Sequence, residues 1–312
     1  MHKVDISILI PVYNSDLSLR ELVVRINEVF QNILMSYEIV FINDGSPNPK
    51  THSMLMELFD NHKDIVRCFE LRRNFGRPAA LMCGFTQCKG EYIIMMDDDL
   101  QHDPEYIPEF LKQKEHDVVI ASFKNKKHNF FKRITSDIKG WFDYKLIGKP
   151  RHIRNSSYKM IKQSVIVSIN RMNVTSPFIS GLLFYVTRDI INIEIEHRKR
   201  KHGKTGFTLK KMSQQFFNLL FNNSSFLLKV VSYTGIMFSI IGFVLSMYYL
   251  IRYFTARTII QGWTSLIILN LITSGLILFS LGVFGEYFIR IIHLTEKRPS
   301  YVIKNKMEKN PD

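Results

Sequence analysis

Cysteine is scarce in this sequence, and its pattern excludes a disulfide framework. Only Cys68, Cys83 and Cys88 occur among 312 residues, and no two of them form a CxxC pair. Small secreted domains instead carry an even and larger set of cysteines that pair with one another. We therefore expect three reduced thiols that pack inside a cytosolic domain.

Charge is missing from two long stretches near the end of the chain. Neither Val230–Leu250 nor Trp263–Gly285 contains a charged residue. Each stretch is about long enough to cross a ~30 Å hydrocarbon core as a helix. Two buried helices of a soluble domain are the alternative, but adjacent charge-free runs of about 20 residues are rare there. The short linker 251–262 therefore predicts a two-helix transmembrane hairpin, with spans over 230–251 and 263–285.

A signal peptide pattern is also missing, because residues 1–5 lead directly into a strand pattern. We expect no cleaved leader. The tail 286–312 is more basic than the linker 251–262, and the positive-inside rule places such a tail in the cytoplasm. A hairpin returns the chain to the side on which it started, so the N-terminal domain is expected there as well.

The chain is strongly basic, with a formal net charge of +14. This excess favours an anionic partner such as nucleic acid, anionic lipid or a phosphorylated substrate. Much of it lies in two stretches, 124–133 and 197–204, which could equally be solvated loops or contacts with an anionic membrane. Segment 208–226 combines apolar residues with Lys210 and Lys211 on its polar side, which predicts an amphipathic helix at the membrane interface.

The first hundred residues alternate between the two periodicities of secondary structure. Apolar runs predict strands over 6–14, 37–42, 66–71 and 93–96, and helical spacing predicts helices over 18–35, 51–62 and 78–88. Pro11 is expected to stop the first of these strands. A further strand is predicted over 117–122. Strands that alternate with helices form a doubly wound, mostly parallel sheet with helices on both faces. We assign residues 1–207 to this α/β domain.

Three consecutive carboxylates follow the fourth apolar run. Residues Ile93–Met96 can lie in a buried strand, but Asp97, Asp98 and Asp99 cannot be buried without partners. They are therefore expected where the strand leaves the sheet, at the edge where ligands bind in open α/β sheets. Asp97 and Asp99 would point the same way along an extended backbone, as hard ligands for Mg²⁺ or Mn²⁺ with a phosphate-bearing substrate. A solvated acidic turn is the alternative.

Polar clusters also end two earlier strands, at Asn43–Ser46 and Arg72–Gly76. Parallel strands bring their carboxyl ends to one edge, so these clusters are expected beside the carboxylates. Their convergence favours a nucleotide site.

Further motifs match those of a known family in the same order along nearly the whole chain. They are Pro11-Val12-Tyr13-Asn14, Asn43-Asp44-Gly45-Ser46, Arg73-Asn74-Phe75-Gly76, Asp97-x-Asp99-Leu100-Gln101, Phe131-Lys132-Arg133, Arg200-x-x-Gly203-x-Thr205, Gly285-Glu286-Tyr287 and Arg298-Pro299-x-Tyr301. The sequence thus resembles glycosyltransferase family 2 enzymes that act on polyprenyl phosphate, such as bactoprenol glucosyltransferases, undecaprenyl-phosphate 4-deoxy-4-formamido-arabinose transferases and dolichol-phosphate mannose synthases. This resemblance implies a GT-A catalytic domain, a nucleotide-sugar donor and a bacterial inner-membrane enzyme of cell-envelope glycan synthesis. It also implies a homo-oligomer, a tetramer in relatives.

The resemblance implies a role for each matching residue. The residues expected in catalysis are Asp97, Asp99, Gln101 and Arg200, of which the two aspartates also bind Mg²⁺ or Mn²⁺. The nucleotide-sugar is expected at Pro11, Tyr13, Asp44, Arg73 and Asp97. The acceptor phosphate is expected at Lys124, Lys132, Arg133, Ser136 and Lys204.

One position departs from the family pattern. Many relatives have Asp-Phe-Arg-Leu where this chain has Ser157-Tyr158-Lys159-Met160, so no catalytic base is assigned here. A lipid phosphate is already anionic near neutral pH, because its second pKa is about 6, and it does not need a base. The resemblance to the arabinose-type transferases, which also carry serine here, implies an amino- or deoxy-sugar donor, and the motifs do not specify the sugar further.

Two rival functions share features with this sequence. A processive polysaccharide synthase shares the Asp-x-Asp motif but carries Gln-x-x-Arg-Trp, and neither Trp141 nor Trp263 follows that pattern. A membrane-anchored nucleic-acid-binding module would suit the positive charge. Carboxylates in the cleft would repel a nucleic acid backbone, so we expect no nucleic acid partner.

Overall fold

The computed structural model describes residues 4–123, 149–150, 152–172, 174, 177–196, scattered positions between 231 and 251, 262–295 and 299–309. The chain forms two compact units. One comprises Met1–Gly206 together with Lys297–Asp312, and the other is Phe207–Glu296. The first unit is therefore discontinuous in sequence, because the second is inserted near its C-terminal end.

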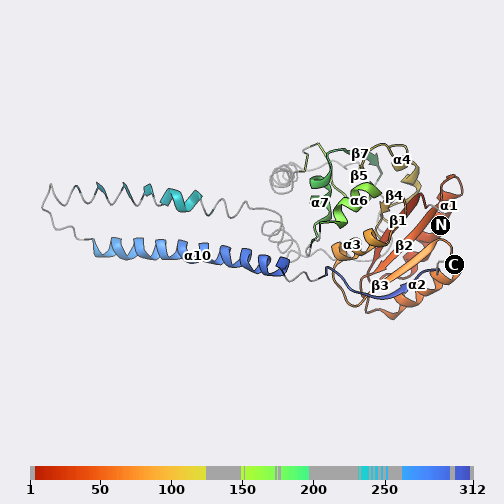
Figure 1. The fold of residues 1–312 in the computed structure, drawn as a ribbon, viewed down its shortest axis with the longest axis horizontal. Helices are drawn as coiled ribbons and strands as arrows, with labels where there is room; N and C mark the ends of the chain where they lie inside the picture. The colour runs from red at the N-terminus through yellow and green to blue at the C-terminus, as the bar shows by residue number, and fades with distance from the viewer. Residues whose placement is uncertain are drawn as a thin grey trace. The chain divides into compact units, whose positions relative to one another are not determined.

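An eight-stranded sheet forms the centre of the first unit, in the order β7-β5-β6-β4-β1-β2-β3-β8 (Figure 1). The strands are β1 (Ile6–Val12), β2 (Tyr37–Asn43), β3 (Val66–Leu71), β4 (Tyr92–Met95), β5 (Val118–Phe123), β6 (Lys159–Lys162), β7 (Ile190–Ile195) and β8 (Ile303–Met307). Strands β1 to β4 pair in parallel, as do β5 and β7, whereas β6 and β8 run antiparallel to their neighbours. The predicted mostly parallel sheet is confirmed.

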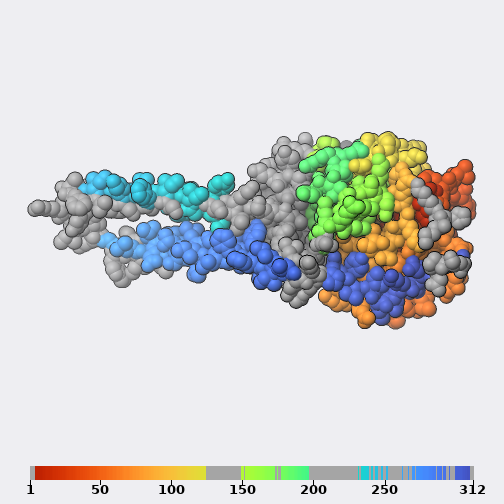
Figure 2. Space-filling view, in the orientation of Figure 1, coloured from red at the N-terminus to blue at the C-terminus, as the bar shows by residue number. Residues whose placement is uncertain are grey.

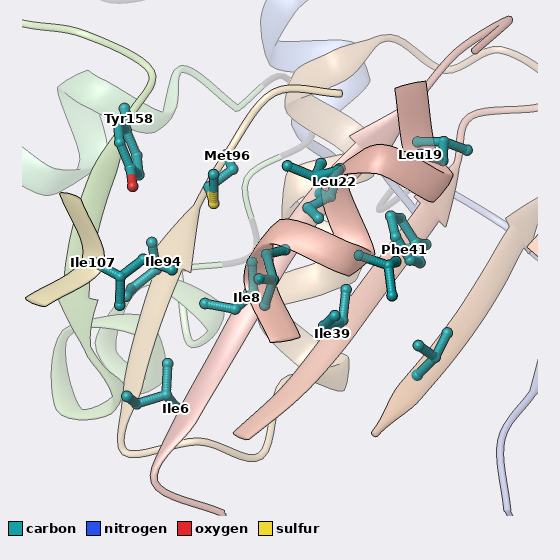
Figure 3. Close-up of a cluster of buried hydrophobic side chains, with 14 of the residues drawn as sticks. Ile6, Ile8, Leu19, Leu22, Ile39, Phe41, Ile94, Met96, Ile107 and Tyr158 are labelled. Carbon is teal, nitrogen blue, oxygen red and sulfur yellow. The ribbon is translucent and has the colours of Figure 1, made fainter. Parts of the chain in front are cut away.

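Helices cover both faces of this sheet. The helices of the first unit are α1 (Leu17–Phe30), α2 (Pro49–Asn61), α3 (Arg77–Gln87), α4 (Ile107–Leu111), α6 (Gln163–Asn170) and α7 (Ile179–Val186), with a 3₁₀ turn, η1, over Pro104–Tyr106. Successive side chains of a strand point to opposite faces. Accordingly Ile8 packs in the cluster under α1 and α2, where Figure 3 shows it near Leu22, and Leu9 packs in the cluster under α3, α6 and α7. The doubly wound architecture follows from this alternation.

The three cysteines confirm the expectation of packing groups. Cys68 lies in the first of these clusters, and Cys83 and Cys88 lie in the second. All three are buried and free of disulfides. Burial raises the pKa of each thiol, which suits inert core residues.

Element boundaries differ from the prediction at two places. Helix α1 ends at Phe30 and not near 35, because the chain turns at Gln31 and Asn32. The first strand continues through Pro11 to Val12, whose carbonyl accepts from the Asp44 amide at 2.9 Å. Proline lacks only its own backbone N–H, so the neighbouring backbone groups still hydrogen-bond to the adjacent strands.

The C-terminal segment forms a strand where the sequence predicts only a basic tail. Strand β8 pairs with β3, and Figure 2 shows this blue segment lying against orange parts of the same unit. The Arg72 amide donates to the Val302 carbonyl at 2.9 Å, and the Arg67 guanidinium lies 2.6 Å from Glu308. Residues 304–306 are exposed, as is typical of an edge strand that discourages further pairing.

The second unit contains α10 (Trp263–Thr295), a helix of 33 residues. Its segment Ile272–Ile289 has a mean hydropathy of 1.6 and is long and apolar enough to cross a membrane. Large apolar side chains such as Leu278 and Leu281 are more than half exposed. The described positions between 231 and 251 are helical, and the rest of the predicted first span lies outside the described residues. The predicted interfacial helix 208–226 lies outside the described residues.

Candidate functional site

Four polar segments meet at one edge of the sheet, because β1 to β4 are parallel and adjacent. Residues 13–15 follow β1, Asp44 follows β2, residues 72–76 follow β3 and residues 97–99 follow β4. The predicted convergence of polar strand ends is therefore confirmed. This is the edge at which open α/β sheets bind ligands.

The acidic segment is not extended as predicted. Strand β4 ends at Met95, the chain turns at Asp98 and Asp99, and Leu100 has a φ of 61°. The turn gives each carboxylate a different set of partners. Alternation along a strand therefore does not explain how Asp97 and Asp99 are placed.

Asp97 is held by partners from three segments. One carboxylate oxygen forms an ion pair with the Arg77 guanidinium at the start of α3. The other accepts from the Ser157 hydroxyl at 2.8 Å and lies 3.7 Å from His102 Nε2. Burial raises the pKa of Asp97, but Arg77, His102 and Ser157 outweigh it and hold the pKa below its usual value. Asp97 is therefore anionic near neutral pH.

His102 closes a ring of hydrogen bonds that begins and ends on Asp97. Its Nδ1 accepts from the Asp97 amide at 2.9 Å, so the neutral ring carries its hydrogen on Nε2. Nε2 lies 3.4 Å from Ser157 Oγ, which itself donates to Asp97. The imidazole is buried and stacks on Tyr158 with ring centroids 4.9 Å apart. This ring fixes the direction of one Asp97 oxygen.

Asp98 turns towards the loop after β1. Its Oδ2 accepts from the Ser15 hydroxyl at 2.6 Å and from the Tyr13 amide at 3.4 Å. Burial and the neighbouring carboxylates raise the pKa of Asp98 to about 6, against the opposing effect of these two hydrogen bonds. The middle aspartate thus orders the loop that carries Tyr13.

Asp99 accepts from the Gln101 amide at 3.2 Å. In the part of the chain that the structure describes, no group of three or more His, Cys, Asp or Glu side chains forms a metal cage. Asp97 and Asp99 nevertheless offer the carboxylate oxygens that Mg²⁺ and Mn²⁺ prefer. Mg²⁺ is commonly held by one or two carboxylates with substrate phosphates and water, so this donor set fits a metal that arrives with a diphosphate.

Asp44 organises the loop after β3. It is buried, and its two oxygens accept from the amides of Phe75 at 2.8 Å and Gly76 at 2.9 Å. Burial raises the pKa of Asp44, and the two hydrogen bonds oppose this rise. Gly45 next to it has a φ of 60°, and a Cβ there would lie 2.3 Å from the Arg73 carbonyl carbon. Only glycine permits this close approach of the two loops.

The residues predicted to bind the nucleotide-sugar lie at this edge in different environments. Pro11 is buried in β1, whereas Tyr13 is 46% exposed. Arg73 is exposed, and its guanidinium lies over the Phe75 ring at 4.4 Å from the centroid. The other predicted residues lie outside the described part of the chain, namely Lys124, Lys132, Arg133, Ser136, Arg200 and Lys204.

No role is predicted from the sequence for Arg77, His102 and Lys159, and two of these three residues left a signal. Arg77 occupies the first turn of a helix, where a cation opposes the helix dipole. Such a placement indicates another partner, and the structure identifies it as Asp97. Lys159 is the second residue. It stands between the apolar residues Tyr158 and Met160 in a buried strand, and a lysine is almost never fully buried unless it is paired.

Lys159 leads to a prediction about stability. Burial and the nearby Arg77 charge lower the pKa of Lys159 from 10.5 to about 7. Between pH 7 and 10.5 the folded state binds fewer protons than the unfolded state, so the free energy of unfolding rises with pH in this window. Lys159→Met should therefore be more stable than wild type by about 1–4 kcal/mol below pH 7.

Thermal unfolding of both proteins at pH 6.5 and at pH 9.5 measures this difference. The advantage of the Met variant should shrink at the higher pH. An advantage that grows with pH would contradict the lowered pKa.

Comparison with known proteins identifies similar sequences over nearly the whole chain. Residues 7–178 match the family described as Glycosyl transferase family 2. The uncharacterized glycosyltransferase YkcC of Bacillus subtilis is 33% identical over 309 residues, which cover 96% of this chain and 93% of that protein. The undecaprenyl-phosphate 4-deoxy-4-formamido-L-arabinose transferase of Photorhabdus laumondii is 27% identical, with 96% and 93% covered. Among solved structures, glucosyl-3-phosphoglycerate synthase from Mycobacterium tuberculosis matches with a TM-score of 0.49 and 13% identity, over 70% of this chain and 80% of that one.

Proposed function

This chain belongs to glycosyltransferase family 2. We propose that it transfers a sugar from a UDP-sugar to polyprenyl phosphate at a membrane. The observation that carries the proposal is Asp97, fixed by three side chains at the carboxyl edge of the sheet next to a second carboxylate. Relatives at 27–28% identity over nearly the whole chain are named undecaprenyl-phosphate transferases, which supports this acceptor. The product would serve cell-envelope glycan synthesis.

In the proposed reaction a phosphate oxygen of the acceptor attacks the anomeric carbon of the donor sugar. The bond between that carbon and the nucleoside diphosphate breaks, and the diphosphate leaves with the electron pair. A divalent cation held by Asp97 and Asp99 would neutralise charge on the leaving diphosphate. Asp44 and Asp98 position the loops that carry Arg73 and Tyr13, which lets these exposed side chains face the nucleotide. Gln101 would position a substrate from the turn after Asp99.

The acceptor side of the proposal rests on basic residues that the sequence singles out. We assign Lys124, Lys132, Arg133, Ser136 and Lys204 to the acceptor phosphate, and Arg200 to the developing charge of the leaving group. Cations with several donors suit a phosphate monoester, because charge-assisted hydrogen bonds are about twice as strong as neutral ones. The acceptor needs no base, because its phosphate is already anionic.

Connectivity supports a membrane anchor that returns to its starting side. Residues on both flanks of the inserted unit, up to Gly206 and from Lys297, belong to one compact unit. If α10 crosses a bilayer, the insertion must cross it an even number of times. A second crossing within 230–251 satisfies this condition and gives the proposed hairpin.

This topology predicts the labelling of single cysteines in intact cells. A membrane-impermeant thiol reagent should label Thr255→Cys, in the outer linker, and should not label Lys309→Cys in the cytoplasm. Wild type is the matched control, because Cys68, Cys83 and Cys88 are buried and should stay unlabelled. Labelling of Lys309→Cys alone would place the catalytic unit on the side without nucleotide-sugars.

A donor screen tests the proposed function. Purified full-length protein is incubated with undecaprenyl phosphate, Mg²⁺ or Mn²⁺, and a panel of UDP-, GDP- and dTDP-sugars. Mass spectrometry of the lipid should show one phosphate-linked sugar, which also identifies the donor. No glycosylated lipid with any donor, while the protein remains folded, would contradict the acceptor assignment.

A further inference from the structure

One motif of the family resemblance, Arg298-Pro299-x-Tyr301, has no part in the proposed reaction. Tyr301 is half-buried and packs against the apolar cluster under α3, α6 and α7, and its hydroxyl oxygen lies 2.8 Å from Thr86 Oγ1. The Thr86 hydroxyl donates to the Cys83 carbonyl at 2.8 Å, so Tyr301 is the donor in the bond between the two hydroxyls. Thr86 is the last residue but one of α3. Tyr301 therefore ties the C-terminal segment to the end of that helix.

The next residues of the C-terminal segment hold the start of loop 72–76, which leads into α3. Strand β8 pairs antiparallel with β3 (Figure 1), and Leu71, the last residue of β3, pairs with Ile303. One residue further along, the Arg72 amide donates to the Val302 carbonyl at 2.9 Å. Together with the bond from Tyr301, these contacts hold both ends of one segment, which consists of the loop and α3.

This segment carries several contacts of the candidate site. The amides of Phe75 and Gly76 donate to Asp44, and Arg77 at the start of α3 pairs with Asp97. Gly76 is the N-cap residue of α3, has a φ of 92° and offers no side chain to cap the helix. The position of the loop is therefore set by Asp44 on one side and by the contacts at the two ends of the segment on the other.

Arg73, a proposed nucleotide contact, stands on this loop. It is exposed, and its guanidinium lies over Phe75, which packs against the same apolar cluster as Tyr301 and Ile303. An exposed side chain keeps its place only while the backbone beneath it is fixed, and a loop that is ordered before binding spares the ligand the cost of ordering it. The contacts of residues 301–303 thus bear on nucleotide affinity, although none of these residues is itself a proposed nucleotide contact.

We propose that Tyr301 is a positioning residue, which fixes loop 72–76 and α3 in the arrangement that binds the nucleoside diphosphate of the donor. This role rests on the proposed function, in which the loop faces the nucleotide. Tyr301 follows Thr295, the last residue of α10, by six residues. The loop is therefore fixed by a part of the chain that has already passed through the inserted unit. The nucleotide site is complete only when the chain returns from that unit.

Tyr301→Ala tests this role in the full-length protein in detergent, because it removes both the ring and the hydroxyl. Hydrogen exchange followed by mass spectrometry should show that peptides covering 72–77 exchange about tenfold faster than in wild type, since fewer contacts oppose local opening of the loop. In the presence of Mg²⁺, calorimetry should show an affinity for UDP about tenfold lower, because binding must then order the loop. The affinity for undecaprenyl phosphate should remain that of wild type, since no proposed acceptor contact lies in this segment.

Two smaller changes separate the hydroxyl from the ring. Tyr301→Phe keeps the ring in the apolar cluster and should lower the affinity for UDP about threefold, the scale of one hydrogen bond between neutral groups. Thr86→Val removes the acceptor of the same bond and should have the same effect, with no further loss in the double variant. Losses that add in the double variant would overturn the role of Tyr301 as a residue that acts through Thr86.

Tyr37→Ala is the matched control. Tyr37 is also half-buried, stacks on Phe30 with ring centroids 3.9 Å apart and donates to Asn27 at 2.9 Å. It begins β2, at the opposite end of that strand from Asp44. The control should lower the Tm as Tyr301→Ala does, and it should leave exchange at 72–77 and the affinity for UDP as in wild type. The positioning role is overturned if Tyr301→Ala leaves both at wild-type values, or if it weakens the binding of UDP and undecaprenyl phosphate equally.

Hydrogen exchange requires neither a substrate nor turnover, so it separates this role from the proposed function. Faster exchange at 72–77 in Tyr301→Ala, in a protein that glycosylates no lipid, would refute the proposed function and support the link between Tyr301 and the loop. Unchanged exchange and UDP affinity in Tyr301→Ala, in a protein that does glycosylate lipid, would support the proposed function and overturn the positioning role.

Discussion

Asp99→Asn should lower turnover by about 100-fold or more, the scale on which enzymes lose a preorganised group that stabilises charge. The amide keeps the size of the side chain and can still accept from the Gln101 amide. It loses the negative charge that attracts a divalent cation. Asp97→Asn should have an effect at least as large, because it also removes the partner of Arg77. Both are measured as initial rates of lipid glycosylation over a series of Mg²⁺ and Mn²⁺ concentrations.

Asp98→Asn is the matched control within the same triplet. Asp98 accepts from Ser15 and Tyr13, and an amide oxygen can accept the same bonds. We expect a loss below about tenfold, the scale of one ordinary hydrogen bond. Equal losses in all three variants, or full wild-type activity in excess EDTA, would refute the assignment of Asp97 and Asp99 to a metal.

Deleting residues 299–312 should destabilise the catalytic unit although it removes a segment far from the site in sequence. Strand β8 covers the edge of β3, and Tyr301 and Ile303 pack on the second apolar cluster. The Arg67 guanidinium would lose Glu308 but keep Glu38. The lost ion pair, strand pairing and apolar packing together should cost ~3 kcal/mol or more, and each kcal/mol lowers Tm by about 2–4 °C at this size. The Tm should fall by about 10 °C or more.

Lys309→Ala provides the control for this deletion. Lys309 pairs with Asp64, and both side chains are more than half exposed. Such a surface pair contributes little, about 1 kcal/mol at most. Thermal unfolding should leave this variant close to wild type. A deletion protein with wild-type Tm would mean that β8 is not part of the cooperative unit.

The local pattern of this chain determines most of its α/β elements. Apolar runs of strand length and helical spacing place β1 to β5 and α1 to α3 within a few residues, because burial on a sheet face imposes these periods on the sequence. Consecutive βα units also dictate parallel pairing of the first strands. The carboxylates after β4 could be placed at the carboxyl edge on the same grounds, since an aspartate triplet cannot continue a buried strand.

Strands β6 and β8 could not be predicted in this way. Each is short and pairs antiparallel with a strand distant in sequence, and β8 carries Lys304 and Lys306 on an exposed edge. Their position is decided by neighbouring strands, whose free edges they complete. No periodicity within the local sequence indicates such pairing.

The side chains that contact Asp97 could not be predicted from a local sequence pattern either. The sequence by itself determines that Asp97 stands at a strand end, because this follows from residues 93–99 alone. Only the tertiary structure brings Arg77, His102 and Ser157 to that carboxylate, and only it places Lys159 beneath Asn155 and Ser180. These contacts join segments separated by up to 60 residues at Asp97, so their energies depend on the packing of the whole sheet and not on any local pattern.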